Sequence, residues 1–329
     1  MLSPRVLKNS VALAFSLTVL ASACSYAATA PEAGTLKMGV EPWLGYGQWH
    51  VATANDLYKK NGLEKVDVIN FAEDKDINAA LASGQIDAAN IATHTAMGMI
   101  AAGLPVKVVL LLDQSQTADA MLVSGDVKTL KDLKGKQVAF EEGTTSDILL
   151  HSALASAGLS FRDIKPVPMP AATAGSALIA KRVPVAVTYE PYLTVAMKGD
   201  PSLKMLYSGA SDPGLISDVL VVRDEVIKNR PGQIAALIKT WDAAVAHYQA
   251  NTQADRDVIA KAVGATPEDL KTAFDGVKYY SLAENRALLG KDFTNKTFPH
   301  VLKAATEAGI VQQPVTPEQV IDASFVNAK

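Results

Sequence analysis

The alternation of apolar and polar positions predicts strands and helices in turn along the chain. In its first part, short apolar runs predict strands at 35–40, 66–71, 86–91 and 106–112. Apolar positions at helical spacing predict helices at 48–60, 76–82 and 93–102, and a glycine follows closely after each of them. Strands that alternate with helices are typical of an α/β fold with mostly parallel sheets.

A second series of strands and helices begins after a polar stretch without periodicity, 113–117. Its predicted strands are 120–123, 137–140, 164–167, 184–187 and 203–207, and its predicted helices are 145–157, 172–181 and 191–197. After a second polar stretch, 208–214, the chain is predicted to be nearly all helical, at 231–250, 252–263, 267–274, 295–308 and 317–323.

Two series joined by two polar crossings predict a two-lobed α/β fold. We expect residues 34–113 and 219–329 in the first lobe, 119–207 in the second, and hinge crossings at 114–118 and 208–218. In such an arrangement a cleft lies between the lobes, where the carboxyl ends of the strands meet.

The first 27 residues have the three zones of a secretory signal peptide. Arg5 and Lys8 give a positive start, 11–20 is an apolar core too short to span a bilayer, and 25–27 is a small-x-small cleavage site. We therefore expect export to the periplasm. Cys24 leaves a lipid-anchored form open.

Composition narrows the classes of partner. Without the signal peptide the chain has no cysteine, and 29 basic side chains face 34 acidic ones. This balance argues against nucleic acid or an anionic membrane as partner. The five histidines show no metal-ligand spacing, so we expect no metal and no cofactor.

Three short motifs, in this order, carry a resemblance to a known family. They are AALASGQIDA at 79–88, LKDLKGKQVA at 130–139 and TYEPY at 188–192. The chain resembles the periplasmic solute-binding proteins of ABC importers in the nitrate, taurine and sulfonate group. That resemblance implies a two-lobed fold of type II, in which each lobe has a mostly parallel sheet flanked by helices. It further implies a monomer that closes over one small solute and delivers it to a permease coupled to an ATPase.

Acidic residues recur directly after the predicted strands and on the crossings, where basic ones are nearly absent. The predicted ligand-binding acids are Glu41, Asp113, Glu141, Glu190 and Asp218, with Asp119 and Glu142 as further acids in the same positions. Paired carboxylates in a closed cleft repel an anion and suit a small cation, because a buried charge must be paired.

Aromatic residues stand beside the first of these acids. In the segment GVEPWLGYGQWH, Glu41 precedes Trp43 and Tyr46, whose ring faces attract a cation, whereas Trp49 is expected to belong to the core. A planar guanidinium satisfies both demands, since it forks to carboxylates and stacks on rings. The same residues resemble a subgroup of the family linked with guanidine or urea-related compounds. Guanidinium or a substituted guanidine is therefore the first expected ligand.

Two other ligand classes stay open at this point. A thiamine-precursor pyrimidine would depend more on the rings than on the acids. An anion such as an aliphatic sulfonate, taurine or nitrate would use the predicted helix start at 143–146, which includes Thr144, but two glutamates immediately precede it. Each acid also has the plainer interpretation of a helix-capping or solvated residue.

An enzyme on the same fold is the alternative from another class. Pyrimidine synthases of thiamine biosynthesis share the two-lobed architecture. A chain that resembles those enzymes is expected to contain their cysteine-rich motif. This chain has one cysteine, within the signal peptide, and no G-x-S-x-G, H-E-x-x-H or glycine-rich phosphate loop. We therefore expect no catalytic activity.

Overall fold

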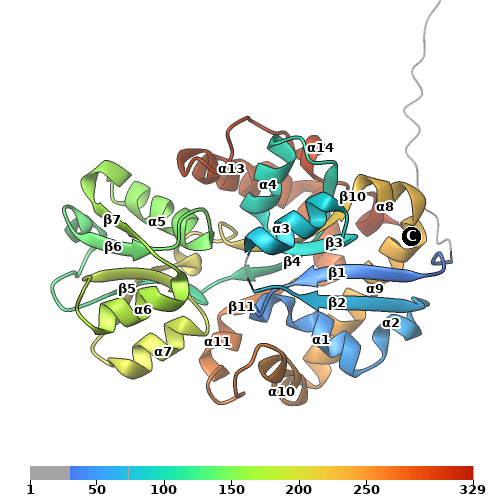
Figure 1. The fold of residues 1–329 in the computed structure, drawn as a ribbon, viewed down its shortest axis with the longest axis horizontal. Coiled ribbons are helices and arrows are strands. Elements are labelled where there is room, and N and C mark those ends of the chain that lie inside the picture. Colours follow the sequence, from blue (N-terminus) through green and yellow to red (C-terminus); the bar gives the residue numbers. More distant parts are fainter. Residues whose placement is uncertain (1–29, 73, 329) are drawn as a thin grey trace, which may run out of the picture.

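The computed structural model describes residues 30–72 and 74–328, and these form two lobes with one sheet each (Figure 1). The first sheet has the order β11-β4-β10-β3-β1-β2 and the second β7-β6-β8-β5-β9. In the first, the strands are β1 Thr35–Val40, β2 Lys65–Asn70, β3 Ala88–Ala92, β4 Val106–Ser115, β10 Ser217–Arg223 and β11 Val277–Tyr279. In the second they are β5 Asp119–Val123, β6 Gln137–Phe140, β7 Lys165–Pro168, β8 Val185–Tyr189 and β9 Lys204–Ser208.

The strands run mostly in one direction within each sheet. β1 pairs in parallel with β2 and β3, and β6 pairs in parallel with β7 and β8. The exceptions are β5, which is antiparallel to its neighbours, and the pair β10 and β11, which both lie antiparallel to β4. β5 and β10 directly follow the two crossings, so the chain enters each sheet there without the helix that a parallel connection needs.

The apolar pattern did not predict β10, although this strand lies near the centre of the first sheet, between β3 and β4. All its residues before Arg223 are buried. A short, continuously apolar run has no alternation to distinguish a buried strand from a helix. The expectation that the chain is nearly all helical after the second crossing was therefore wrong at β10 and at β11.

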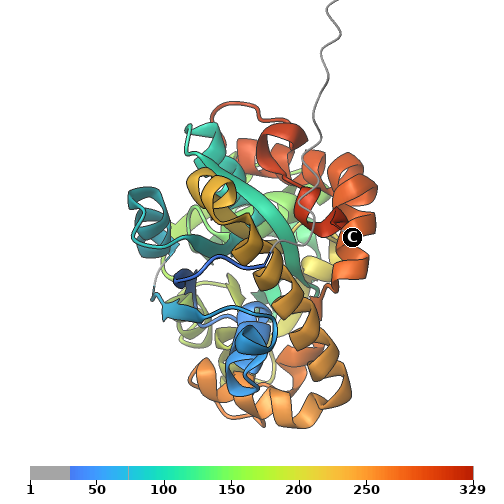
Figure 2. The same ribbon diagram turned by 90° about the vertical axis from the view of Figure 1, so that its right-hand side faces the viewer.

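The helices cover both sheets (Figures 1 and 2). Before β10 they are α1 Gly47–Ala54, α2 Leu57–Lys60, α3 Asp74–Ser83, α4 Thr93–Ala101, α5 Thr145–Ser156, α6 Ala171–Ile179 and α7 Tyr192–Gly199. After β10 they are α8 Asp224–Asn229, α9 Pro231–Ala250, α10 Thr252–Ala262, α11 Lys271–Asp275, α12 Leu282–Ala287, α13 Phe298–Glu307, α14 Pro317–Val320 and α15 Ser324–Asn327. A π-helical segment, Leu288–Thr297, connects α12 to α13.

The predicted helix at 48–60 is two helices. α1 ends at Ala54, and α2 begins after Asp56, whose φ of 55° places it in the left-handed region. Aspartate tolerates that conformation better than most residues because its short polar side chain bonds locally. The predicted helices at 267–274 and 317–323 are likewise shorter than expected, at α11 and α14.

Two tryptophans fix α1 against α9 in the core of the first lobe. Trp49 and Trp241 are fully buried, and their ring centroids lie 4.8 Å apart. The indole N–H of Trp49 donates to Asn90 Oδ1 at 2.7 Å, and that of Trp241 donates to the Tyr280 carbonyl at 2.8 Å. Trp49 is thus a core residue, as expected, and it holds the helix that follows the cleft segment.

The two crossings lie directly against each other. Ala210 N–H, in the second crossing, donates to the Gln116 carbonyl in the first. A Cβ at Gly209 would overlap the Ser115 carbonyl oxygen, so this approach requires glycine.

Among the described residues, no helix has the length and apolar character needed to cross a membrane.

Candidate ligand-binding cleft

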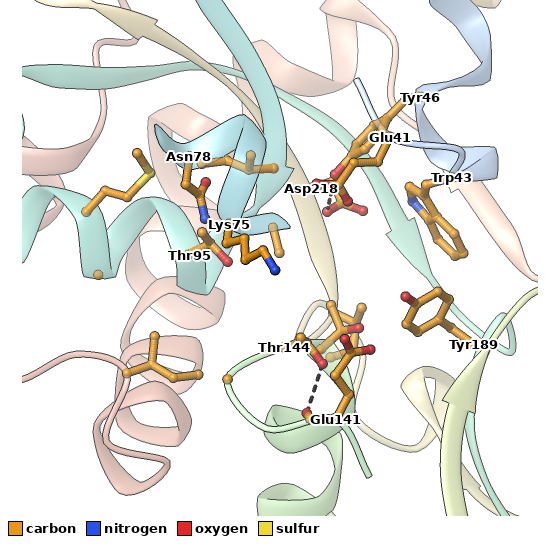
Figure 3. Close-up of a pocket in the computed structure, with 18 of the residues that line it drawn as sticks. Glu41, Trp43, Tyr46, Lys75, Asn78, Thr95, Glu141, Thr144, Tyr189 and Asp218 are labelled. Carbon is orange, nitrogen blue, oxygen red and sulfur yellow. Dashed lines mark hydrogen bonds between the residues drawn. The ribbon is translucent and has the colours of Figure 1, made fainter. Parts of the chain in front are cut away.

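A cleft of about 780 Å³ opens between the lobes at the ends of the strands (Figure 3). Six of the predicted ligand-binding residues line it: Glu41, Trp43, Tyr46, Glu141, Thr144 and Asp218. The other two, Asp113 and Glu190, do not. The first three come from the segment after β1, Asp218 from β10, and the remaining two from the second lobe.

The segment after β1 turns sharply and directs its side chains into the cleft. Trp43 N–H donates to the Glu41 carbonyl at 2.7 Å, and a 3₁₀ turn follows at Leu44–Tyr46. A Cβ at Gly45 would overlap both the Trp43 indole nitrogen and the Asp113 carboxyl group. Glycine at this position therefore allows the indole to lie against that carboxyl group.

Asp218 is the buried acid of the first lobe that lines the cleft. Its Oδ1 accepts a hydrogen bond from the Tyr46 hydroxyl at 3.1 Å. Burial raises the pKa of Asp218 to about 7, and the carboxylate of Asp119 adds to the rise. Tyr46 thus orients the acid rather than only offering a ring face.

Asp113 lies behind Asp218 and not in the cleft. The two are paired across β4 and β10, and Asp113 is completely buried. Burial raises the pKa of Asp113 well above its usual value, and the neighbouring Asp218 raises it further. Asp113 therefore does not line the cleft, and its expected contact with the ligand stays a prediction.

Asp119 lines the cleft as well, at the start of β5. Its backbone N–H donates to Ser115 Oγ at 2.9 Å, which places the side chain just past the first crossing. Burial raises its pKa to about 6, whereas hydrogen bonds from Ser115 and Thr145 lower it. The pattern analysis noted this acid without including it among the predicted ligand-binding residues.

Two residues of the second lobe, Thr144 and Glu141, line the cleft and also bond the start of a helix. Thr144 caps α5, since its Oγ1 accepts from Ser146 N–H at 3.3 Å and donates to the Glu141 carbonyl at 3.0 Å. Glu141 Oε2 accepts from Ala171 N–H, at the start of α6, at 3.0 Å. Capping therefore fixes the position of the Glu141 carboxylate on this side of the cleft (Figure 3).

An aromatic contact joins the lobes at one side of the cleft. Trp43 of the first lobe and Tyr189 of the second meet edge to face, with ring centroids 6.4 Å apart. Tyr192 packs against Tyr189 at 5.6 Å, and all three line the cleft (Figure 3 shows the first two). The motif at 188–192 contains both tyrosines, but its spacing alone did not indicate that they line the cleft.

Glu190 is a helix cap rather than a cleft residue. Its Oε1 accepts from the Thr194 hydroxyl at 2.8 Å and its Oε2 from the Thr194 N–H at 3.0 Å, in the first turn of α7. Burial raises its pKa, and these two hydrogen bonds lower it. Thr194 thus bonds both carboxylate oxygens, and Glu190 is not among the residues that line the cleft. The expected contact of Glu190 with the ligand stays a prediction.

The opposite wall contains one base that the pattern analysis did not select. Lys75 and Asn78 of α3 and Thr95 of α4 line the cleft, and the Lys75 ammonium points into it (Figure 3). Among the described lining residues the acids outnumber it: Glu41, Asp119, Glu141, Glu142 and Asp218. Lys75 was missed because it stands on a helix face within a charged run and does not directly follow a strand.

Metal-ligating side chains form no cluster fit to hold a metal ion in the part of the chain that the structure describes. Within residues 30–72 and 74–328, no three or more His, Cys, Asp or Glu side chains are grouped to hold a metal ion. The predicted signal peptide, 1–27, and Cys24 lie outside the described residues.

Comparison with solved structures identifies the fold. The periplasmic aliphatic sulphonate binding protein of Escherichia coli superposes with a TM-score of 0.74 at 22% identity, over 88% of this chain and 92% of that one. The periplasmic nitrate-binding protein of Synechocystis PCC 6803 gives 0.62 at 16% identity, over 90% and 93%. The chain thus has the two-lobed periplasmic binding protein fold, as predicted.

Sequence comparison identifies the family. A Brucella abortus protein named only as a candidate binding protein is 24% identical over 281 residues, covering 85% of this chain and 87% of its relative. A candidate aliphatic sulfonates-binding protein of Escherichia coli K12 is 28% identical over 262 residues, or 78% and 80% of the two chains. The family model described as NMT1/THI5 like matches residues 47–254, and the chain belongs to that family.

Proposed function

We propose that this protein is the exported solute-binding component of an ABC importer and that it captures a small cationic nitrogen compound. The binding-protein fold and the names of its relatives support the first part of the proposal. In this role the protein acts as a monomer in the periplasm, free or anchored through Cys24, and it delivers its ligand to a permease coupled to an ATPase. Catalysis is not part of this role.

The observation that carries the cationic ligand is the excess of acids in the cleft. Glu41 and Asp218 line the cleft from the first lobe, Asp119 and Glu141 line it from the second, and one lysine stands among the described lining residues. A monocation placed there gains charge-assisted hydrogen bonds to carboxylates. An anion would meet several carboxylates in a poorly screened space.

The rings beside these acids favour a planar cation. Trp43 and Tyr189 present aromatic surface at the cleft wall, and a cation over a ring gains about 0.5 to 2 kcal/mol, depending on desolvation. Guanidinium stacks on a ring while its edge forks to a carboxylate. We therefore propose guanidinium or a substituted guanidine as the first candidate ligand.

An anion is the second candidate, because of two particular features of the cleft. Lys75 points into it, and the capped start of α5 at Gly143 to Thr145 lines it. The names of the sulfonate-binding and nitrate-binding relatives agree with this alternative. A thiamine-precursor pyrimidine remains the third candidate, which would use Trp43, Tyr189 and Tyr192.

Calorimetric titration of the purified mature protein distinguishes these candidates. We expect saturable binding of guanidinium and methylguanidine and no heat from taurine, an alkanesulfonate or nitrate. At a ceiling of about −1.5 kcal/mol per heavy atom, guanidinium itself reaches a Kd of about tens of micromolar. Binding of an anion together with silence from both cations would refute the charge argument.

Neutralising Asp218, one of the acids that line the cleft, tests the same proposal at one residue. Asp218→Asn removes a charge-assisted hydrogen bond worth about 1.5 to 3 kcal/mol, so guanidinium affinity at pH 8 falls at least about tenfold. Asp126→Asn, in an exposed loop of the second lobe, is the matched control and keeps the wild-type Kd. Equal Kd values for the two variants would show that Asp218 does not contact the ligand.

A further inference from the structure

Asp113 is a buried ionisable group that does not line the cleft. It is completely buried on β4, and its register partner on β10 is Asp218. Residues directly opposite each other in an antiparallel pair project to the same face of the sheet, with Cβ atoms about 5 Å apart. Two carboxyl groups therefore face each other at the base of the site.

In the part of the chain that the structure describes, no basic side chain forms an ion pair with Asp113. Tyr279, its register partner on β11, and Tyr280 lie beside it, and the carboxylate of Asp119 adds a further negative charge. The indole N–H of Trp43 stands at the same carboxyl group. No ion pair among the described residues involves Asp113, Asp119 or Asp218.

The hydrogen-bond donors around Asp113 bear on its protonation state. Neither of its oxygens accepts a hydrogen bond of normal geometry from any described residue. A carboxylate in that position would bury an unpaired negative charge. Burying that charge costs far more free energy than keeping the carboxyl group protonated. A protonated carboxyl group instead has one hydrogen to donate, and the carboxylate of Asp218 is the acceptor beside it.

We propose that Asp113 is a positioning residue, a neutral carboxylic acid that donates its proton in a hydrogen bond to Asp218. With Tyr46 O–H donating to Oδ1 from the cleft side, Asp218 is held between two donors. It remains the single ionised member of the pair and presents one negative charge to one monocation. This inference rests on the proposed function, and it assigns Asp113 a role through Asp218 instead of direct contact.

Substitution with an amide separates this role from that of a charged ligand-binding residue. Asparagine at 113 keeps a donor toward Asp218 and never ionises, so Asp113→Asn retains guanidinium affinity within about threefold. Asp113→Val, of similar volume without a donor, leaves Asp218 with one hydrogen bond fewer. Guanidinium affinity then falls about tenfold or more, because hydrogen bonds to charged groups are the stronger ones.

The pH dependence of guanidinium affinity distinguishes this role from a merely structural one, because a structural role would not change the midpoint of the pH profile. Because the Asp218 carboxylate must be ionised, affinity falls by up to about tenfold per pH unit below the pKa of Asp218, which is about 7. Asp113→Asn keeps the midpoint of that profile, whereas Asp113→Val moves it to higher pH. Both variants leave unchanged Tyr46 and Asp119, which shift the pKa of Asp218. They also leave unchanged Glu190, which raises the pKa of Asp119.

Carboxyl carbon NMR of the ligand-free protein, labelled at aspartate, decides the protonation state without any ligand. We expect the Asp113 resonance, assigned by its loss in Asp113→Asn, to remain that of an acid through pH 8. Titration of Asp113 below pH 5, or an Asp113→Asn variant as weak as Asp218→Asn, overturns the proposal. If guanidinium does not bind at all, the proposed function fails and the positioning role with it, while the NMR result still decides the neutral acid.

Discussion

At the scale of single residues, carboxyl groups that look equivalent in the sequence have different tasks. Asp218 lines the cleft, Asp113 supports it from behind, and Glu190 caps a helix. Asp113 and Glu190 follow predicted strands and Asp218 lies on a predicted crossing, so the sequence pattern did not distinguish them. Their difference depends on which neighbour each oxygen meets, which is decided by side-chain direction and packing.

The buried acid pair predicts a particular dependence of stability on pH. The folded-state pKa of Asp113 is raised above its unfolded value of about 3.9, so stability is lost as pH rises above that value. Asparagine at 113 removes this loss. We therefore expect the Tm of Asp113→Asn to exceed that of the wild type more at pH 8 than at pH 4, as measured by calorimetric melting. An equal difference at both pH values would contradict a raised pKa.

At the scale of elements, capping decides what several of these residues do. Thr144 caps α5, Glu141 meets the start of α6, and Glu190 bonds the first turn of α7. The cleft lies at the starts of these helices and the ends of the strands, so a capping residue there is near the cleft whether or not it contacts a ligand.

Substitution of the α7 cap is expected to affect stability and not binding. Glu190→Gln loses one of the two hydrogen bonds to Thr194, which costs about 1 kcal/mol of unfolding free energy. Guanidinium affinity stays within about twofold of the wild type, in contrast to Asp218→Asn. Urea denaturation and calorimetric titration of the same preparation check both parts. A severe loss of guanidinium affinity would instead show that Glu190 contributes to the binding site.

At the scale of the whole molecule, the two crossings contact each other and an aromatic contact spans the cleft between the lobes. Gly209 lies against Ser115 where the crossings meet, and Trp43 meets Tyr189 across the cleft. Closure of the lobes over a ligand excludes water and strengthens the charge pairing inside. The cleft of about 780 Å³ has room for more than a four-heavy-atom guanidinium, which agrees with a substituted guanidine as ligand.

Enlarging the crossing glycine is expected to disturb the relation between the lobes. Gly209→Ala places a methyl group against the Ser115 carbonyl, so the crossings must separate, at a cost of about 1 to 3 kcal/mol in unfolding free energy. Guanidinium affinity also falls. Gly125→Ala, with nothing within 4 Å of the added carbon, is the control. Denaturation and small-angle scattering with and without ligand compare the two variants, and identical behaviour would show that the crossings tolerate the methyl group.

The sequence by itself determined the two-lobed α/β architecture and most strands, because apolar periodicity reports which face of a local segment is buried. It also pointed to Glu41, Trp43, Tyr46 and Asp218, which stand beside strands whose ends converge. Only the tertiary structure decided that β10 enters the first sheet, that Tyr189 meets Trp43, and that Asp113 lies behind Asp218. These relations join segments far apart in the chain, and local pattern carries no information about which distant side chains meet.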